Sequence, residues 1–345
     1  MNQSWGLVLC TLNRPDALFT CISCAVNQTL PPQEIIVIDA SADWEVNKER
    51  ILGELQPRLP GCRWVYVPGR ERSLTVQRNQ GLDLATADVL FMIDDDSYMF
   101  RDCAERIMRI YDADTDKKVV SVAARAAIMP EQGSGAPMPG TGAATTSIGW
   151  KRRMEDILMN SEHMFVPYTG WPDHQLPESI VHLPVRAIRL VTGFRLTVRR
   201  EVAVRVRFCE LLKRYALCED FDFSYRISRH GAIVSSIDGL LYHEMSKSGR
   251  YTRRTVTTMG LLNMGALLRL HSTSRMVGRI KFYQFAAKRF FFEFVADLGR
   301  RRWTLPKTRG VIAAVAAAEP IFSKSDNELG EWYEGLQVKT LERNA

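Results

Sequence analysis

The sequence has no apolar run that is long enough to cross a membrane. The longest runs, such as Val311–Ala318, fall well short of the roughly 20 residues that a membrane-spanning helix needs. The first residues, Met-Asn-Gln-Ser-Trp, also lack the charged leader of a signal peptide. These absences predict a protein that is soluble or peripheral to a membrane, and we expect it in the cytoplasm.

Cysteine is present, but not in a pattern that forms a disulfide framework. The seven cysteines are an odd number and are scattered along the chain of 345 residues. Cys21 and Cys24 form one Cys-x-x-Cys, yet they fall within a predicted helix and have no second pair nearby. A redox or zinc site is therefore not favoured.

A glycine-rich phosphate loop is absent too. The segment 132–149 is rich in Gly, Pro, Ser, Thr and Ala, but no Gly-Lys-Ser/Thr follows it, so it is not a Walker loop. Its composition predicts a mobile loop, and a lid over a site is the functional alternative.

Charged residues are plentiful, and basic ones are in excess. The formal net charge of +7 predicts an anionic partner, which nucleic acid, an anionic membrane surface or a phosphorylated substrate would each provide. Arginine accumulates after Arg250, while the N-terminal part is closer to balance. A hydrophobic content of 46% indicates an ordinary globular protein, and the length allows roughly two domains.

The segment Asp88–Ile93 has the pattern of a buried strand, and three carboxylates, Asp94, Asp95 and Asp96, follow it. Its apolar side chains need cover on both faces, which predicts a central parallel strand. Adjacent carboxylates repel one another unless a cation or hydrogen-bond donors lie between them. Ligands bind at this edge of open α/β sheets, and hard oxygen ligands suit Mg²⁺ or Mn²⁺ bridging a diphosphate. A solvated acidic turn is the plain alternative.

Strand patterns alternate with helix patterns at short spacing, which predicts right-handed βαβ units and a mostly parallel sheet. The predicted strands are 7–11, 34–39, 63–67, 88–93, 119–124, 188–198, 232–237 and 240–243. The predicted helices are about 15–27, 45–55, 74–85, 101–111 and 218–231. Beyond Ser246 we expect helices, basic in character, to the end of the chain.

Glu219 and Asp220 stand in the first turn of the predicted helix 218–231. Acids at this position interact favourably with the helix dipole, so they could serve the helix alone. A functional role is the alternative.

Taken in order, these segments resemble the family-two glycosyltransferases, which are inverting, nucleotide-sugar-dependent enzymes with the GT-A fold. The resemblance covers about residues 7–250, and it includes a DxD motif at Asp94–Asp96 and a Glu-Asp pair at Glu219 and Asp220. The other matching segments are Thr11-Leu-Asn-Arg-Pro15, Val-Ile-Asp39-Ala-Ser, Gln77-Arg-Asn-Gln-Gly81, Gly193-Phe-Arg-Leu-Thr-Val-Arg-Arg200, and His243 with the later Ser-Lys-Ser-Gly-Arg250. Each motif alone is weak, but their order and spacing together are specific.

The resemblance implies an α/β fold of the GT-A type: a Rossmann-like, mostly parallel mixed sheet flanked by helices. Residues 1–250 would form the catalytic domain, with a donor half of about 1–125 and an acceptor half of about 126–250. The helical, basic region 251–345 would bind a membrane or form a homo-oligomer.

The implied reaction is the inverting, metal-dependent transfer of a single sugar. The donor would be a UDP- or dTDP-sugar, and the acceptor a hydroxyl of a glycan or lipid-linked molecule. Synthesis of bacterial surface polysaccharide would be the setting.

The resemblance also assigns roles to single residues. Asp220 would be the catalytic base that deprotonates the acceptor hydroxyl, and Asp96 and His243 would ligate Mn²⁺ or Mg²⁺. The donor-binding residues would be Thr11, Asn13, Arg14, Asp39, Arg78, Asp94, Asp95 and Asp96, with Asp39 at the pyrimidine and Asp94 and Asp95 at the ribose. The acceptor-binding residues would be Trp171, Gly193, Phe194 and Glu219.

The sequence departs from the family's pattern in two places. Gln77 stands where a small residue is usual, and the segment 129–190 is longer than a minimal acceptor region. The Gln-x-x-Arg-Trp motif of processive polysaccharide synthases is absent, which favours transfer of a single sugar.

Two other classes of function stay open. A nucleotidyltransferase that makes a sugar nucleotide would use a similar sheet and metal, but Thr11-Leu-Asn-Arg-Pro15 is not its Gly-rich signature loop. A non-enzymatic basic protein that binds nucleic acid or membrane would explain the C-terminal arginines, but not the acids at strand ends. We expect no nucleic-acid partner.

The segment 275–303 has the pattern of an amphipathic helix. One face would carry apolar residues at three- and four-residue steps, namely Met276, Ile280, Tyr283, Ala287, Phe291, Phe294 and Leu298. Another face would carry Arg275, Arg279, Arg289 and Arg300. The segment would lie on an anionic membrane surface, or its apolar face would pack on the catalytic domain.

Overall fold

The computed structural model describes residues 3–127, 170–244 and 251–342. The chain divides into two compact units. The first unit is made of residues 1–144, 172–210 and 219–246, and the second of residues 145–171, 211–218 and 247–345. The predicted loop 132–149 and the segment 246–250 lie outside the described residues.

The described residues of the first unit form one sheet of nine strands. These are β1 (Trp5–Thr11), β2 (Glu34–Asp39), β3 (Arg63–Pro68), β4 (Val89–Phe91), β5 (Ser97–Met99), β6 (Val119–Ala127), β7 (Val185–Ile188), β8 (Leu196–Arg199) and β9 (Ala232–His243). Their order is β3-β2-β1-β4-β8-β6-β9-β5, with β7 beside β9. Neighbours from β3 to β4 are parallel, and β8 is antiparallel to both of its neighbours. The mixed sheet that was predicted is confirmed.

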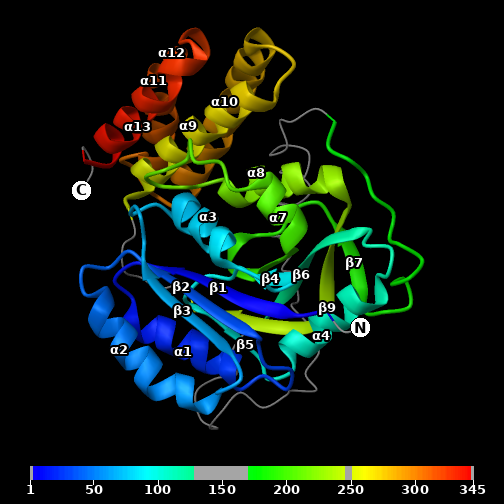
Figure 1. The fold of residues 1–345 in the computed structure, drawn as a ribbon. Coiled ribbons are helices and arrows are strands. Elements are labelled where there is room, and N and C mark those ends of the chain that lie inside the picture. Colours follow the sequence, from blue (N-terminus) through cyan, green and yellow to red (C-terminus); the bar gives the residue numbers. More distant parts are fainter. Residues whose placement is uncertain (1–2, 128–169, 245–250, 343–345) are drawn as a thin grey trace. The chain divides into compact units, whose positions relative to one another are not determined.

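Helices cover both faces of this sheet. The helices α1 (Pro15–Val26), α2 (Trp44–Leu55) and α4 (Cys103–Ala113) contribute to one core cluster. The helices α3 (Leu74–Leu84), α7 (Arg200–Val206) and α8 (Glu219–Ile227) contribute to another. Figure 1 shows α1 and α2 on one side of β1, β2 and β3, and α3 on the other. The α/β class with flanking helices is therefore confirmed.

The parallel register brings the ends of several strands to one edge. Thr11, the last residue of β1, pairs with Asp39, the last residue of β2. The strand β4 is parallel to β1 as well, so the acids that follow it reach the same edge. Met92 and Ile93 remain buried beyond the end of β4 and carry the chain to Asp94.

Three of the predicted strands are divided differently in the structure. The segment 188–198 is not one strand, because β7 ends at Ile188, a 3-10 turn occupies Gly193–Arg195, and β8 begins at Leu196. The predicted strands 232–237 and 240–243 are instead one long strand, β9. Alternating polar and apolar residues suit a strand and a strand with a turn equally well, which is why the break was missed.

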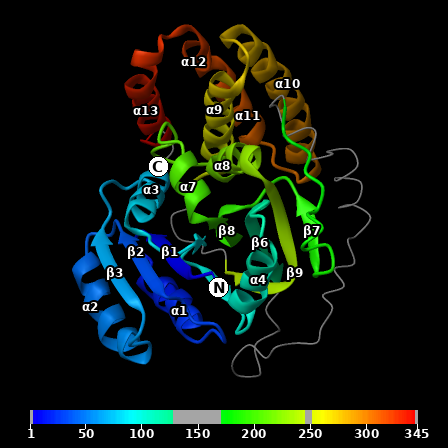
Figure 2. The same ribbon diagram turned by 45° about the vertical axis from the view of Figure 1, so that its right-hand side comes forward.

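The described part of the second unit consists mainly of helices. These are α9 (Arg253–His271), α10 (Arg275–Gly299), α11 (Pro306–Ala317), α12 (Glu319–Ser323) and α13 (Asp326–Glu342). The helical C-terminal region is thus confirmed, and Figure 2 shows α9, α10 and α11 side by side. Thr252 and Ser274 cap α9 and α10 by accepting backbone N–H hydrogen bonds. None of the described helices is long and apolar enough to span a membrane.

Candidate functional site

The strand register places a histidine against the acidic turn. In the antiparallel pair β5 and β9, Ser97 lies opposite His243. Asp96, which precedes Ser97, therefore meets the imidazole, and its Oδ1 lies 3.1 Å from His243 Nε2. The ring of Phe194 stacks on that imidazole at 4.5 Å between centroids and 8° between planes. The ring and the carboxylate together fix the orientation of His243.

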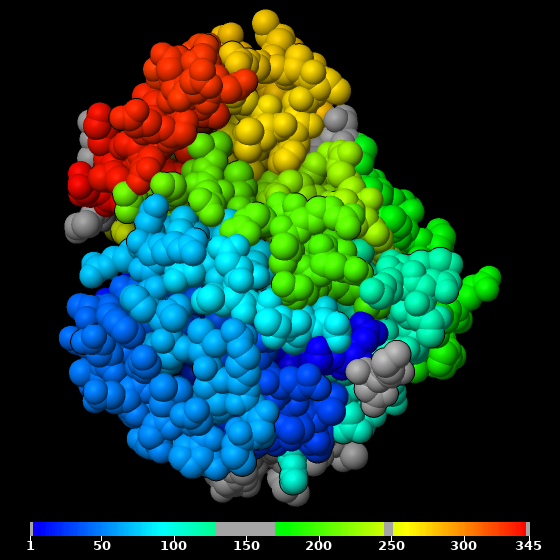
Figure 3. Space-filling view, in the orientation of Figure 1, coloured from blue at the N-terminus to red at the C-terminus, as the bar shows by residue number. Residues whose placement is uncertain are grey.

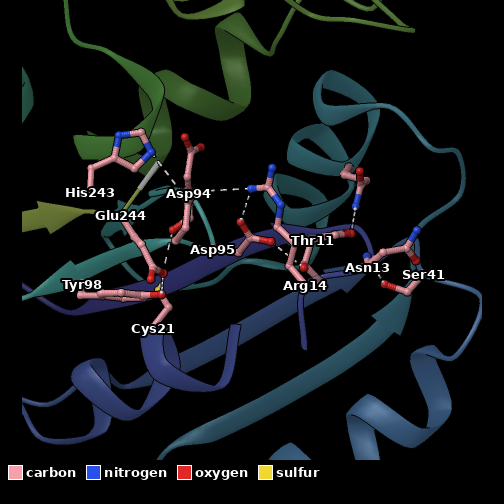
Figure 4. Close-up of polar contacts among 12 residues, drawn as sticks. Thr11, Asn13, Arg14, Cys21, Ser41, Asp94, Asp95, Tyr98, His243 and Glu244 are labelled. Carbon is pink, nitrogen blue, oxygen red and sulfur yellow. Dashed lines mark hydrogen bonds and ion pairs between the residues drawn. The ribbon is translucent and has the colours of Figure 1, made fainter. Parts of the chain in front are cut away.

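Asp94, Asp96 and His243 form a group that could hold a metal ion. One ligand atom from each lies within 4.8 Å of the others, a grouping found by searching the residues that the structure describes. Two carboxylates and one imidazole suit Mn²⁺ and also fit Mg²⁺. Figure 4 shows Asp94 and His243 side by side. The Asp-Asp-His group therefore suggests a divalent metal.

Protonation of His243 would compete with metal binding. Burial by itself would lower the pKa of His243, but the hydrogen bond to Asp96 and the charges of Asp96 and Asp94 raise it above its ordinary value. A bound metal would displace this proton, because a histidine ligand must be neutral at the coordinating nitrogen.

Asp95 points to the other side of the turn. Its Oδ2 accepts a hydrogen bond of 2.7 Å from Thr11 Oγ1, and its Oδ1 accepts one of 3.1 Å from Arg14. The same Arg14 nitrogen lies 3.5 Å from Asp96 Oδ2, and Figure 4 shows this chain of contacts. Burial raises the pKa of Asp95 to about 6 in spite of these donors. Asp95 thereby holds Arg14 at the end of β1.

Asp39 is buried and fully engaged with the protein. Its Oδ1 accepts from the backbone N–H of Ser41 at 2.8 Å. Its Oδ2 accepts from Asn47 at 2.9 Å and from the Tyr66 hydroxyl at 2.7 Å. These contacts join β2, α2 and β3. The predicted contact of Asp39 with a nucleotide base would be an additional one.

Arg78 links the acidic turn to the Glu-Asp pair. This buried guanidinium lies 3.1 Å from Asp94 Oδ1 and 2.7 Å from Glu219 Oε1. The contact with Glu219 is an ion pair that does not have the geometry of a hydrogen bond. It also lies over the ring of Phe208 at 5.1 Å. The close approach requires Gly193, because a Cβ there would stand 2.7 Å from Arg78 Nη2. Arg78 compensates two carboxylates at once.

Glu219 and Asp220 both lie in an environment that favours their protonated forms. Burial raises the pKa of Glu219 to about 8, although Arg78 opposes the shift, and the buried Glu219 Oε2 has no hydrogen-bond partner among the described residues. Burial also raises the pKa of Asp220. Asp220 accepts from the backbone N–H groups of Phe221 at 2.8 Å and Gly193 at 3.3 Å. These two hydrogen bonds oppose the effect of burial on the pKa of Asp220, but burial is the larger influence, so the carboxylate accepts a proton more readily than an exposed aspartate does.

Most of the site residues predicted from the sequence meet at this edge of the sheet. Asn13 has a left-handed backbone (φ 56°) and donates its N–H to Ser41 Oγ at 2.7 Å. Trp171 belongs to the second unit, so its place relative to this edge is not described.

Gln77 was noted in the sequence only as a departure from the family. Its side-chain amide donates to the carbonyls of Thr11 at 3.1 Å and Ile38 at 2.9 Å, so it joins the ends of β1 and β2. Its place one residue before Arg78, on a helix that faces these strand ends, was the signal available. Asp94 was assigned to the ribose alone, whereas the structure also places it in the Asp-Asp-His group.

Comparison with known proteins gives the same picture for the fold. Residues 7–170 match the model of the family described as Glycosyl transferase family 2. The mannosyltransferase PcManGT from Pyrobaculum calidifontis, in complex with GDP-Man and Mn²⁺, superposes with a TM-score of 0.53 at 14% identity, over 92% of this chain and 87% of that chain. TarS 1–349 from S. aureus, in complex with UDP-GlcNAc, superposes with a TM-score of 0.52 at 10% identity, over 98% of this chain and 89% of that chain. No curated protein matches the sequence significantly.

The family model covers residues 7–170, less than half of the chain, and the fold of the chain is GT-A-like. At such low identities the structural similarity establishes the fold alone. The chemistry has to be argued from the residues at the sheet edge.

Proposed function

We propose that this protein is an inverting glycosyltransferase that moves one sugar from a nucleotide-diphosphate sugar to an acceptor hydroxyl. The observation that carries the proposal is the placement of Asp94, Asp96 and His243 beside Arg78 and Glu219 at the edge where the parallel strands end. Three potential metal ligands and a buried arginine are what a diphosphate leaving group needs for charge compensation. A solvated acidic turn would need neither.

Asp94, Asp96 and His243 would hold Mn²⁺ or Mg²⁺, which supplies Lewis-acid stabilisation of the departing diphosphate. Arg14, held by Asp95 and 31% exposed at its side chain, can turn toward the same phosphates. Arg78 is buried and fixes Asp94 and Glu219 rather than reaching into solvent. The protein's part is thus to position the ligands before the donor arrives.

Asp220 would act as the base. Its carboxylate takes the proton of the acceptor hydroxyl while that oxygen forms a bond to the anomeric carbon. The bond from the anomeric carbon to the phosphate oxygen breaks in the same displacement, and its electron pair leaves with the nucleotide diphosphate. One displacement inverts the carbon, and the raised pKa of Asp220 makes it a stronger base than an exposed aspartate.

The proposal also covers the identity of the donor nucleotide and the class of acceptor. We propose a UDP- or dTDP-sugar donor on the strength of Asp39, with Asp94 and Asp95 toward the ribose. The acceptor would be a glycan or a lipid-linked molecule in surface-polysaccharide synthesis, near Gly193, Phe194 and Glu219 of the first unit. No disulfide joins the seven cysteines, all of which lie among the described residues, and this favours the cytoplasm as the place of reaction.

A screen of donors tests the binding step. We expect UDP- or dTDP-sugars with Mn²⁺ to raise the thermal midpoint, because a ligand that binds only the folded state stabilises it. GDP-sugars are the matched comparison, since one structural neighbour holds GDP-Man and the other UDP-GlcNAc. A shift with GDP-sugars alone would overturn the pyrimidine part of the proposal, and no shift with any nucleotide sugar would overturn the donor site.

Replacing the proposed base tests the chemical step. Asp220→Asn should keep the donor-induced thermal shift and lose transfer by ~10²-fold or more, because the amide cannot accept the proton. Asp102→Asn is the matched control, since Asp102 is also an acid at the start of a helix in the first unit. Product formed by Asp220→Asn at the rate of the wild type would refute this role.

A further inference from the structure

The helix α10 turns its acids inward and several large apolar side chains outward. Its only two acids, Glu293 and Asp297, are both buried. Glu293 pairs with Arg289 and with Lys307 at 2.8 Å each. Asp297 accepts from the backbone N–H groups of Lys307 at 3.0 Å and Thr308 at 3.1 Å. The buried face of α10 is therefore polar in part, and its outer face bears no carboxylate.

The outer face of α10 carries several large exposed apolar side chains, which we together call the α10 stripe. Its exposed residues are Met276, Ile280, Phe291, Phe294, Val295 and Leu298. Phe291 is 62% exposed and Met276 60%, values far above those of core residues. A groove of about 430 Å³ between α10 and α11, lined almost wholly by apolar side chains such as Phe290 and Ile312, lies beside the stripe. Part of the surface of this helix is visible in gold in Figure 3. Apolar surface of this extent on a soluble unit marks an interaction site.

Cations flank the α10 stripe. Lys281 and Lys288 lie along one side of it, and Arg300 and Arg301 follow its end, next to Trp303, which is 76% exposed. Among the residues that the structure describes, none of these four cations has an ion-pair partner. The stripe is therefore bounded by positive charge that the protein does not neutralise.

Three of the four arginines predicted to face a membrane form ion pairs within the protein. Arg275 pairs with Asp326 at 3.1 Å, Arg279 with Glu319 at 3.2 Å, and Arg289 with Glu293. The first two pairs join α10 to α13 and α12, and the third lies within α10. Because Arg275, Arg279 and Arg289 are already paired, Lys281, Lys288, Arg300 and Arg301 are the cations left to meet a partner.

We propose that the α10 stripe lies in the interface of an anionic lipid membrane. Aromatic and aliphatic side chains would enter the boundary of the acyl chains, while the flanking cations would meet anionic headgroups. A second copy of the chain fits less well, because two such surfaces would bring like charges together without a compensating acid on α10. Nucleic acid would use the cations but not the large apolar area. The membrane-associating role is independent of the catalytic proposal.

Sedimentation of the full-length protein with vesicles tests the charge contribution. The wild type should bind vesicles of phosphatidylcholine with phosphatidylserine, and bind much less to phosphatidylcholine alone. Arg300→Glu with Arg301→Glu should weaken binding about 30-fold or more, since each basic residue near an anionic surface contributes roughly fivefold. The matched control is Lys117→Glu with Lys118→Glu, which reverses two adjacent exposed cations on the first unit and should bind as the wild type does.

A second pair of variants tests the apolar contribution. Phe291→Ser with Val295→Ser should lower vesicle binding at least tenfold without lowering the thermal midpoint, because both side chains are already exposed. Val46→Ser with Val181→Ser removes equally exposed apolar groups from the first unit and should bind normally. Equal binding to neutral and anionic vesicles, or to neither, would overturn the proposal. So would a dimer in sedimentation velocity that becomes a monomer in Phe291→Ser with Val295→Ser.

Discussion

At the scale of single residues, Asp96 contacts His243 and would also be a ligand of the proposed metal ion. Asp96→Ala should abolish the Mn²⁺-dependent part of nucleotide binding, because the loss of a hard oxygen ligand leaves the diphosphate charge poorly compensated. His243→Ala should weaken it less, since two carboxylates remain. The measurement is the thermal shift with a nucleoside diphosphate, with and without Mn²⁺.

Asp95→Asn provides the matched control for Asp96→Ala. Its side chain contacts Thr11 and Arg14, not His243, so the variant should keep a shift that depends on Mn²⁺. If chelation by EDTA leaves transfer at full rate, the acids serve the ribose or the fold and the metal interpretation is wrong.

Several of these residue contacts could be foreseen and others could not. The acids at strand ends are visible in the sequence, and the family resemblance implied that Thr11, Asp39 and Asp94 would all lie at the donor site. The contacts of Gln77 with two strand carbonyls, and of Arg78 with Glu219, depend on distances between segments far apart in the chain. No periodicity reports such distances, so the role of Gln77 was missed.

At the scale of elements, the turn that begins at Gly193 lies close to Arg78 of α3 and Glu219 of α8. Gly193→Ala would place a Cβ 2.7 Å from Arg78 Nη2 and 3.1 Å from Glu219 Oε1. The guanidinium would have to move, weakening its contacts with Asp94 and Glu219. We expect a loss of about 1–3 kcal/mol in the free energy of unfolding, as for other overpacked sites, together with weaker donor binding. Chemical denaturation and the thermal shift measure the two effects.

Gly53→Ala is the matched control for that prediction. Gly53 lies within α2 and has open space where a Cβ would stand. The substitution should stabilise the protein by roughly 0.5–1 kcal/mol, because alanine loses less backbone freedom on folding. A Gly193→Ala protein as stable and as active as the wild type would mean that Arg78 is not held by this turn.

The elements themselves were largely predictable where apolar periodicity and caps agree. The strand 34–39 has the bounds that were predicted, and α2 begins one residue early. The 188–198 segment was predicted wrongly because its alternating pattern does not distinguish one strand from a strand that is interrupted by a turn. The helix α10 was predicted as well, but the sequence did not show that Arg275 and Arg279 pair with Asp326 and Glu319 of other helices.

At the scale of the whole molecule, the two units interleave along the chain. The sequence suggested a boundary near residue 250, where composition changes. The structure also joins residues 211–218 to the helical unit, because Asn263 of α9 donates to the carbonyls of Tyr215 and Leu217 at 2.9 Å each. A composition shift cannot report a short segment that crosses from one unit to the other.

The raised pKa values of the buried acids predict how the stability of the protein depends on pH. Burial raises the pKa of Asp95 to about 6 and that of Glu219 to about 8, above their ordinary values of 3.8 and 4.5. Between pH 5 and pH 8 the folded protein therefore binds more protons than the unfolded chain. Stability falls with rising pH wherever the folded state binds more protons, so this contribution is lost as pH rises through 6 and then 8. The raised pKa of His243 acts in the same direction.

We therefore expect the thermal midpoint of the first unit to be lower at pH 8 than at pH 5.5, with a free-energy change on the order of 1–3 kcal/mol. Glu219→Gln, which stays neutral at both pH values, should reduce the difference. Mn²⁺ with a nucleoside diphosphate should also reduce it, because the ligand requires ionised carboxylates and so binds more tightly at the higher pH. A midpoint that rises with pH, or a decrease that is unchanged in Glu219→Gln, would show that Glu219 is already ionised in the folded protein. Arg78 would then compensate its charge fully, and the buried acids would lower stability less than their burial implies.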